Sequence, residues 1–192
     1  MNANLNALLT RRSTSVRDLT APAPNDAELE QILRAATRVP DHGKLAPWRI
    51  VVLRGEGAAK LGDLAADIYM RNTPEAEEKH REHERQRFLR APLCLAVIAT
   101  PKESIKAPDW EQYLSAGAVC MNILHAAHAL GYGTKWLSEW VAYDAEILAA
   151  LLAPAAVPGN ARIAGFIYLG TKTAEPEERE RPELGEVVEE FR

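Results

Sequence analysis

The sequence predicts an α/β sandwich in which helices pack on a mixed sheet, formed by one domain, residues 1–192. Three apolar runs, 48–54, 92–99 and 162–170, are typical of buried strands, and segments with helical spacing lie between them. The length suits one domain with a sizeable core. Neither an internal repeat nor a linker divides the chain.

The N-terminal quarter is expected to hold two helices and the first clear strand. A short helix precedes Thr10, because leucines recur there at near-helical spacing. A second helix is expected from Asp26, which can cap it, to about Arg38. Pro40 then ends the helical run, and the strand 48–54 follows.

The remaining helices differ in how they are expected to be buried. Helical spacing returns at 57–70, whereas 74–90 is charged almost all round, which favours a solvated helix over a mobile cover for a site. Apolar and small residues occupy nearly every face of 108–133, so this helix is buried on all sides or lies in a subunit interface. A short strand or loop at 133–138 and a helix at 144–153 complete the order.

Composition excludes several classes of function. The formal net charge is -4 and the pI is about 5.8, so no general affinity for nucleic acid or an anionic membrane is expected. The opening residues lack the order of a secretory signal, and a soluble cytoplasmic protein is expected. Cys94 and Cys120 are predicted to be buried thiols. Neither histidine pair on the predicted helices has a carboxylate at a recognised ligand spacing, so no metal site is expected.

Phosphate-type donors gather in "TRRSTSVR", residues 10–17. Guanidinium groups bind phosphate through paired hydrogen bonds, and a hydroxyl adds one more donor. Arg11, Arg12 and Ser13 could therefore hold a terminal phosphate monoester. The alternative is that the arginines cap helix carbonyls and stay solvated. The usual signatures for a dinucleotide, a P-loop or a serine nucleophile are missing from the sequence.

A second unusual stretch is "RVPDHGKLAPW", residues 38–48, which joins a helix to a buried strand. Ligands commonly dock at such a strand edge. Arg38, His42 and Lys44 supply polar donors, and the prolines stiffen the loop.

Taken in order, these stretches and later ones resemble the FMN-dependent nitroreductase family, in particular its short, minimal branch of NAD(P)H nitroreductases. The resemblance runs nearly end to end. The matching segments are Arg11-Arg12-Ser13, Pro40 to Trp48, Asn122 with "AHALGYG" at 127–133, Tyr168 to Gly170, and Arg179, Arg181 and Pro182 before "GEVV". The resemblance implies an α+β, nitroreductase-like fold with a mainly antiparallel central sheet flanked by helices. It also implies a domain-swapped homodimer with FMN at the interface and a C-terminal tail, about 171–192, on the partner subunit.

The same resemblance assigns residues to the phosphate end of the cofactor. Arg11, Arg12 and Ser13 would hold the ribityl phosphate and the lower edge of the ring. Arg179 or Arg181 would add phosphate contacts. A dianionic phosphate needs cationic partners of this kind.

At the ring end, Arg38 and His42 would face the flavin, from the other subunit. Trp136, Leu137 and Ser138 align with the segment that passes beside the isoalloxazine ring, where backbone groups meet N5 and O4. For Trp136, a core or interface position is the alternative to ring contact.

Three positions depart from the family pattern. Ser15 stands where a basic residue is frequent, which leaves the cation near flavin N1 unassigned, with Arg38 or Arg12 as candidate replacements. Ala46 stands where glutamine is usual before Pro-Trp. Glu139 stands where glycine commonly follows the N5 segment, so its carboxylate lies near the ring or points to solvent.

The resemblance implies an FMN-dependent NAD(P)H oxidoreductase with ping-pong hydride transfer through flavin N5 to a nitroaromatic, quinone or similar electron-poor acceptor. No catalytic side chain is expected, because the flavin carries the redox chemistry. The alternatives are a non-enzymatic flavin-binding or sensing module, a flavin enzyme with a specialised substrate, and an unrelated α/β domain. The sequence does not distinguish NADH from NADPH.

Overall fold

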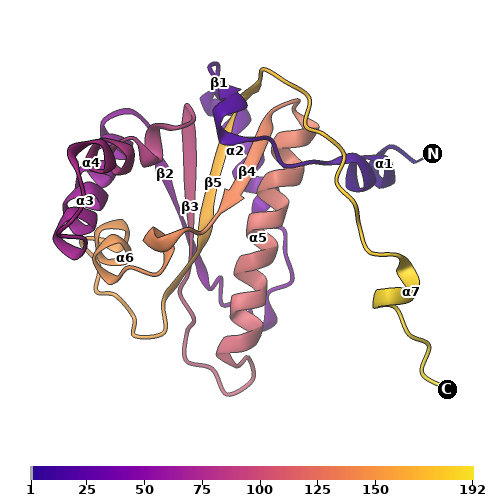
Figure 1. Ribbon diagram of the computed structural model, residues 1–192. Helices are drawn as coiled ribbons and strands as arrows, with labels where there is room; N and C mark the ends of the chain where they lie inside the picture. The colour runs from indigo at the N-terminus through magenta and orange to yellow at the C-terminus, as the bar shows by residue number, and fades with distance from the viewer. Residues whose placement is uncertain (1) are drawn as a thin grey trace.

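The computed structural model describes residues 2–192 as a sheet covered by helices on both faces, with a C-terminal tail that leaves the body (Figure 1). Short 3₁₀ turns connect the main elements: η1 (Val16–Asp18), η2 (His42–Lys44), η3 (Arg87–Leu89) and η4 (Trp140–Ala142). The helices and strands are α1 (Ala3–Thr10), β1 (Leu19–Thr20), α2 (Asp26–Ala36), β2 (Trp48–Leu53), α3 (Gly55–Asn72), α4 (Glu78–Arg85), β3 (Leu93–Ala99), α5 (Asp109–Ala129), β4 (Gly133–Leu137), α6 (Ala145–Leu152), β5 (Arg162–Lys172) and α7 (Leu184–Val187).

The sheet has five strands in the order β1-β5-β3-β2, and β4 also pairs with β5. All pairings between strands of the described chain are antiparallel, so the sheet is not mixed. Alternation of strands with helices suggested a parallel component, but two helices, α3 and α4, separate β2 from β3 and return the chain in the opposite direction. The mainly antiparallel sheet flanked by helices is confirmed.

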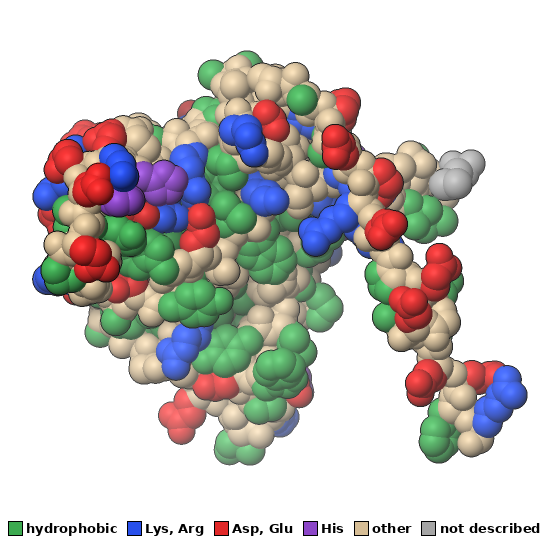
Figure 2. All heavy atoms as spheres, viewed as in Figure 1, with side chains coloured by type: hydrophobic (Ala, Val, Ile, Leu, Met, Phe, Trp, Pro, Cys, Tyr) green, Lys and Arg blue, Asp and Glu red, His purple; other side chains and the backbone are tan. Residues whose placement is uncertain are grey.

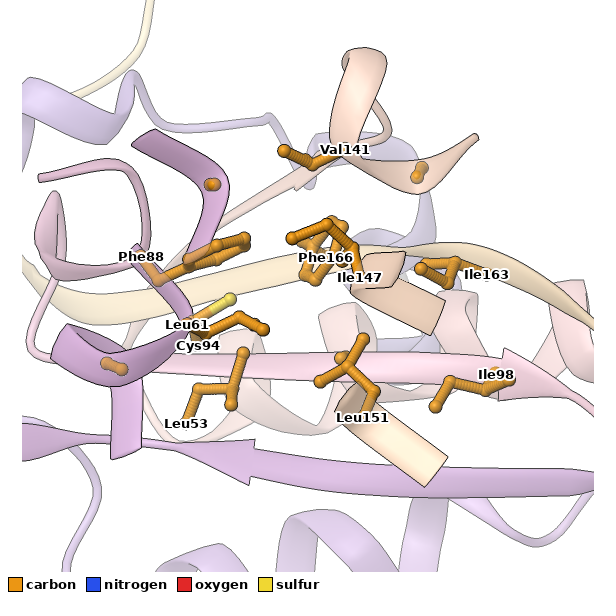
Figure 3. Packing of buried hydrophobic residues seen from close by; sticks show 14 of the residues in the cluster. Leu53, Leu61, Phe88, Cys94, Ile98, Val141, Ile147, Leu151, Ile163 and Phe166 are labelled. Atoms are coloured by element: carbon orange, nitrogen blue, oxygen red, sulfur yellow. The ribbon is translucent and has the colours of Figure 1, made fainter. Parts of the chain in front are cut away.

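Two apolar cores lie on the two faces of the sheet, because side chains of a strand alternate between faces. Along β3, Cys94, Ala96 and Ile98 enter one core, whereas Leu93, Leu95 and Val97 enter the other. α3, η3 and α6 cover the first core, shown in Figure 3, where the rings of Phe88 and Phe166 lie 5.0 Å apart between centroids. α2 and α5 cover the second. Cys94 and Cys120 are buried free thiols, as predicted.

The charged segment at 74–90 is helical only from Glu78, where α4 begins, and not from the predicted start. α4 packs against α3 at Gly62, where a Cβ would lie 2.1 Å from the carbonyl oxygen of Arg85. An ion pair between Arg85 Nε and Asp63 Oδ1, 2.9 Å apart, joins the two helices at the same place. The solvated face predicted for this segment is present, but the other face is docked on α3.

The start of α2 lies beside the predicted one, but the capping residue differs. Asn25 caps α2, not Asp26 as predicted, because its side chain accepts from Glu28 N while the Glu28 carboxylate accepts from Asn25 N. The half-buried Asn122 donates to the carbonyl oxygen of Ala35, in the last turn of α2, and to that of Arg38, which follows the helix.

α5 is buried along one face only, so burial on all sides is excluded. Its other face exposes Trp110 and Leu114, which are 68% and 55% accessible. The placement of this helix in a subunit interface stays a prediction. Within residues 2–192, none of the helices combines the length and the apolar character needed to cross a membrane.

Candidate functional site

The Arg-Arg-Ser stretch leaves α1 and is fastened to the start of β4. Thr14, which is buried, donates its backbone N–H to the carbonyl oxygen of Thr134 at 2.9 Å. Glycine is required at position 133 beside it, because a Cβ there would lie 2.8 Å from the Thr14 hydroxyl oxygen and 2.6 Å from the Lys172 side chain. The backbone hydrogen bond between Thr14 and Thr134 holds the preceding residues, Arg11, Arg12 and Ser13, at the edge of the sheet.

Arg11 is the cation whose surroundings most resemble an anion site. Its Nε and Nη1 atoms are buried, and neither has a hydrogen-bond partner in the described part of the chain. Burial lowers the pKa of Arg11, and the charges of Arg181 and Arg12 lower it further. A guanidinium held beside other cations, with two donors unused, has the donors that an anion such as phosphate would satisfy.

Arg12 is held in place by the protein itself. Its Nη1 donates to the carbonyl oxygens of Leu9 and Arg11 at 3.0 Å and 2.9 Å, and its Nη2 forms an ion pair with Glu178. The helix-capping alternative therefore describes Arg12 in part, whereas Arg11 makes no such contact in residues 2–192.

The tail supplies the remaining cations predicted for this end of the site. Arg179 and Arg181 are exposed. Arg181 lies close enough to Arg11 for its positive charge to lower the pKa of Arg11. Lys and Arg side chains gather on the body beside the departing tail, which itself carries mostly acidic and apolar side chains (Figure 2). Although the tail is acidic as a whole, it places the positive charge of Arg181 near Arg11.

Ser13 opens onto a broad cavity of about 1020 Å³. Serine hydroxyls and four basic side chains contribute to its wall, together with three carboxylates. The lining residues are Ser13, Ser15, Val16, Arg17, Asp18, His83, Arg90, Lys135, Ala174, Glu175, Pro176 and Glu177. A smaller cavity of about 210 Å³ adjoins Arg12, Thr14 and Lys172.

The predicted ring segment, 136–138, forms the end of β4 and the residue after it. Trp136 is 36% exposed, and its Nε1 donates to the carbonyl oxygen of Ala164 at 3.1 Å. Gly165 lies under the indole, since a Cβ there would be 2.0 Å from Trp136 Nε1. Leu137 packs against the first core. The side chains of Trp136 and Leu137 are therefore held by the protein.

Glu139 follows this segment and is engaged in an ion-pair network rather than pointing freely to solvent. Its Oε2 lies 2.8 Å from Arg87 Nη1 and 2.6 Å from Arg90 Nη2. Burial alone would raise the pKa of Glu139, but Arg90 and Arg87 outweigh it and hold that pKa below its ordinary value.

The loop that carries Arg38 and His42 lies at a different pocket. His42 Nδ1 is 2.7 Å from Glu111 Oε2, and both residues line an apolar cavity of about 360 Å³ with Leu114. Arg38 is exposed. Neither Arg38 nor His42 lines the cavities that contain Arg12 and Ser13, so one chain does not bring these two groups of predicted residues into a common pocket.

The sequence did not identify two basic residues, Arg90 and Lys135, that line the broad cavity. Lys135 and Arg90 line the broad cavity with Ser15, whereas Arg38 and Arg12 were the candidates for the cation in this place. The sequence feature that could have indicated Arg90 is Glu139, which stands where glycine is common in the family. A half-buried carboxylate needs a basic partner, so a nearby arginine or lysine was to be expected. Among residues 2–192, no group of three or more potential ligand side chains is arranged to hold a metal ion.

Comparison with known proteins identifies the family to which the chain is similar. A model described as "Nitroreductase family" matches residues 8–171. "Putative NAD(P)H nitroreductase YdjA" of Escherichia coli (strain K12) is 35% identical over 173 residues, 87% of each chain. "Putative NAD(P)H nitroreductase" of Haemophilus influenzae (strain ATCC 51907 / DSM 11121 / KW20 / Rd) is 41% identical over 139 residues, 71% of this chain and 73% of that protein.

Solved structures share the fold. A nitroreductase-like family protein from Bacillus cereus superposes with a TM-score of 0.80 at 24% identity, covering 100% of this chain and 97% of the other. A "putative nitroreductase in complex with fmn" from Desulfovibrio desulfuricans gives a TM-score of 0.73 at 24% identity, covering 100% and 98%. The predicted nitroreductase-like fold is thus confirmed. Because the family model spans most of the chain and two relatives exceed 30% identity, this protein belongs to the nitroreductase family of oxidoreductases.

Proposed function

We propose that this chain is an FMN-dependent NAD(P)H oxidoreductase that reduces electron-poor acceptors such as nitroaromatics or quinones with ping-pong kinetics. Family membership supports the reaction class, and two relatives carry the name of NAD(P)H nitroreductases. The protein from Desulfovibrio desulfuricans, which shares the fold, was solved in complex with FMN.

The observation that carries the proposal is the pair of buried, unpartnered nitrogens of Arg11. Leaving such donors without an acceptor is unfavourable, so the site fits a group that brings a strong acceptor. The FMN phosphate is such a group. Arg11 would bind it, Ser13 would add a hydroxyl donor, and Arg181 from the tail would add a third contact. Arg12 is paired with Glu178, which offsets its charge, so Arg12 would contribute to the phosphate site when that ion pair opens.

When bound, FMN supplies hydride transfer between the nicotinamide and the acceptor. The chain itself orients the ring. Trp136 and Leu137 are fixed by Ala164 and the core, which leaves the backbone of 136–138 as a stiff edge beside the ring. Lys135 would supply positive charge on the cavity side, in the place where Ser15 replaces a basic residue, whereas the charge of Arg90 is offset by its ion pair with Glu139.

A homodimer would complete the site. Large apolar side chains are exposed on α1, on the outer face of α5 and along the tail, which favours an interface formed by these elements. Thr171 and Lys172 belong to β5 and pair with β1, so the tail that would lie on the partner subunit is limited to the residues after them, 173–192. The partner subunit would in turn bring Arg38 and His42 toward the flavin. Sedimentation of the purified protein tests this directly, since a monomer in the presence of excess FMN would contradict it.

The visible spectrum of the purified protein tests the activity. Flavin bands near 450 nm, about the wavelength of free oxidised flavin, should be present after addition of FMN and gel filtration. Anaerobic NADH or NADPH should bleach them, and a nitroaromatic or quinone should restore them. Bands that persist with both nicotinamides would identify a flavin-binding module that does not oxidise them. Protein that retains no FMN would reject the proposal.

A further inference from the structure

The turn after β4 has a backbone conformation that residues with a side chain rarely adopt. Glu139 has φ 54° and ψ -177°, a region occupied almost only by glycine. Such a conformation persists when surrounding contacts hold it. The contacts that hold Glu139 are therefore informative about what this turn does.

The Glu139 carboxylate is held by two arginines. Arg90 donates through Nη1 to Oε1 at 3.2 Å and through Nη2 to Oε2 at 2.6 Å, so both carboxylate oxygens are bound. Arg87 Nη1 lies 2.8 Å from the same Oε2 atom. The side chains of Glu139 and Arg90 are 31% and 23% accessible, which limits screening of this pair by water.

Further hydrogen bonds from neighbouring residues hold Arg87 and Arg90 in place. Buried Arg87 is bound by Glu84 through Nε at 2.6 Å, and Trp140 Nε1 donates to the same carboxylate at 3.1 Å. Arg90 donates through Nε to the carbonyl oxygen of Arg87 and through Nη2 to the hydroxyl of Tyr168. The network thus ties η3 to the end of β4 and to β5, and it has little freedom to rearrange.

The charges of this network cancel. Arg87 and Arg90 contribute two positive charges, and Glu84 and Glu139 contribute two negative charges. Arg90 also faces the broad cavity beside Ser13, Ser15 and Lys135. A glycine at position 139 would keep the turn and leave the network with one net positive charge at the wall of that cavity.

We propose that Glu139 is a positioning residue that fixes the turn after β4 and neutralises Arg90, so that the wall of the cavity bears less positive charge toward a bound flavin. This inference rests on the proposed function. A reduced flavin carries more negative charge than an oxidised one, and a nearby cation stabilises it. Glu139 therefore lowers the preference of the site for reduced FMN over oxidised FMN.

The test compares Glu139→Gly and Glu139→Gln with the parent and with Glu146→Gln. Glycine suits the turn and glutamine preserves side-chain size, but both remove the charge. Glu146 forms a surface ion pair with Arg71, so its substitution makes the same change in net charge at another place. The measurements are the dissociation constant of oxidised FMN and the two-electron midpoint potential of bound FMN, from anaerobic spectroscopic titration against a reference dye.

Both Glu139 variants should favour reduced FMN over oxidised FMN by about tenfold relative to the parent, which raises the two-electron potential by about 30 mV. Glu146→Gln should match the parent. Variants that bind FMN at the parent's potential would overturn the inference and leave the proposed function intact. A shift in only one of the two variants would also overturn it, because the lost charge is common to both. A parent that takes up no FMN would overturn both.

Discussion

Arg11→Met is expected to stabilise the FMN-free protein and to weaken its affinity for FMN. The substitution keeps an unbranched apolar stem and removes the guanidinium. Two buried nitrogens of Arg11 have no partner within residues 2–192, and burial and neighbouring cations lower its pKa. The charged group therefore destabilises the protein when the anion is not bound.

The expected gain in stability and the expected loss of FMN affinity can both be estimated from the two unpartnered nitrogens of Arg11. An unsatisfied buried donor costs roughly 1–3 kcal/mol, and the partial exposure of Arg11 reduces that figure. A gain of about 1 kcal/mol corresponds to a rise in Tm of about 2–4 °C for a chain of this length. Loss of charge-assisted hydrogen bonds to a phosphate is worth about 1.5–3 kcal/mol, or roughly 10- to 150-fold in Kd.

Thermal unfolding followed by circular dichroism measures the first effect, and quenching of flavin fluorescence at fixed ionic strength measures the second. Arg34→Met is the matched control, because Arg34 forms an exposed i,i+4 pair with Glu30 and should change either quantity little. An FMN Kd for Arg11→Met within about threefold of the parent would refute the assignment of Arg11 to the phosphate. A Tm below the parent's would refute the argument about unsatisfied donors.

Two further predictions concern the packing of α4 and the network at Glu139. Gly62→Ala should destabilise the protein by about 1–3 kcal/mol and loosen α4, because the new Cβ would lie 2.1 Å from Arg85 O. Urea unfolding and hydrogen exchange of residues 78–85 check this, and Gly57→Ala, where no heavy atom lies within 4 Å of the new Cβ, should be neutral or stabilising. The lowered pKa of Glu139 means that its contribution to stability is present above the ordinary value of 4.5 and is lost as pH falls through the folded-state value. Urea titrations at pH 7 and below pH 4.5 should therefore show a smaller difference between the parent and Glu139→Gln in acid; a constant difference would exclude this linkage.

The strands were predictable because their apolar runs are long and uninterrupted. β2, β3 and β5 lie within two residues of the predicted ends, and 133–138 is resolved as a strand by its pairing with β5. The charged segment was harder, because 74–90 has no apolar periodicity to define a start. Its helix begins at Glu78, and its packing depends on Gly62, which is distant in sequence.

The candidate site likewise has one part that the sequence predicts and one part that it does not. The importance of Arg11 could be inferred from its neighbours in sequence, since adjacent arginines and a serine form a recognisable phosphate motif. Arg90 could not, because its relation to Ser15 and Glu139 depends on three separated segments that meet only in the folded chain. Glu139 itself was noticed as an exception, but one sequence does not identify the cation that holds it.

The tail described above has a practical consequence for preparing the protein. Residues 179–192 are accessible along their whole length, including Phe191. In any subunit whose tail is not covered by a partner, an extended, accessible peptide of this kind is the first place where a contaminating protease cuts. A cut before Arg181 would remove that residue and spare the sheet, so the sample would keep its circular dichroism spectrum while its cofactor occupancy declined. Intact mass spectrometry of each batch is therefore needed to interpret any measured flavin stoichiometry.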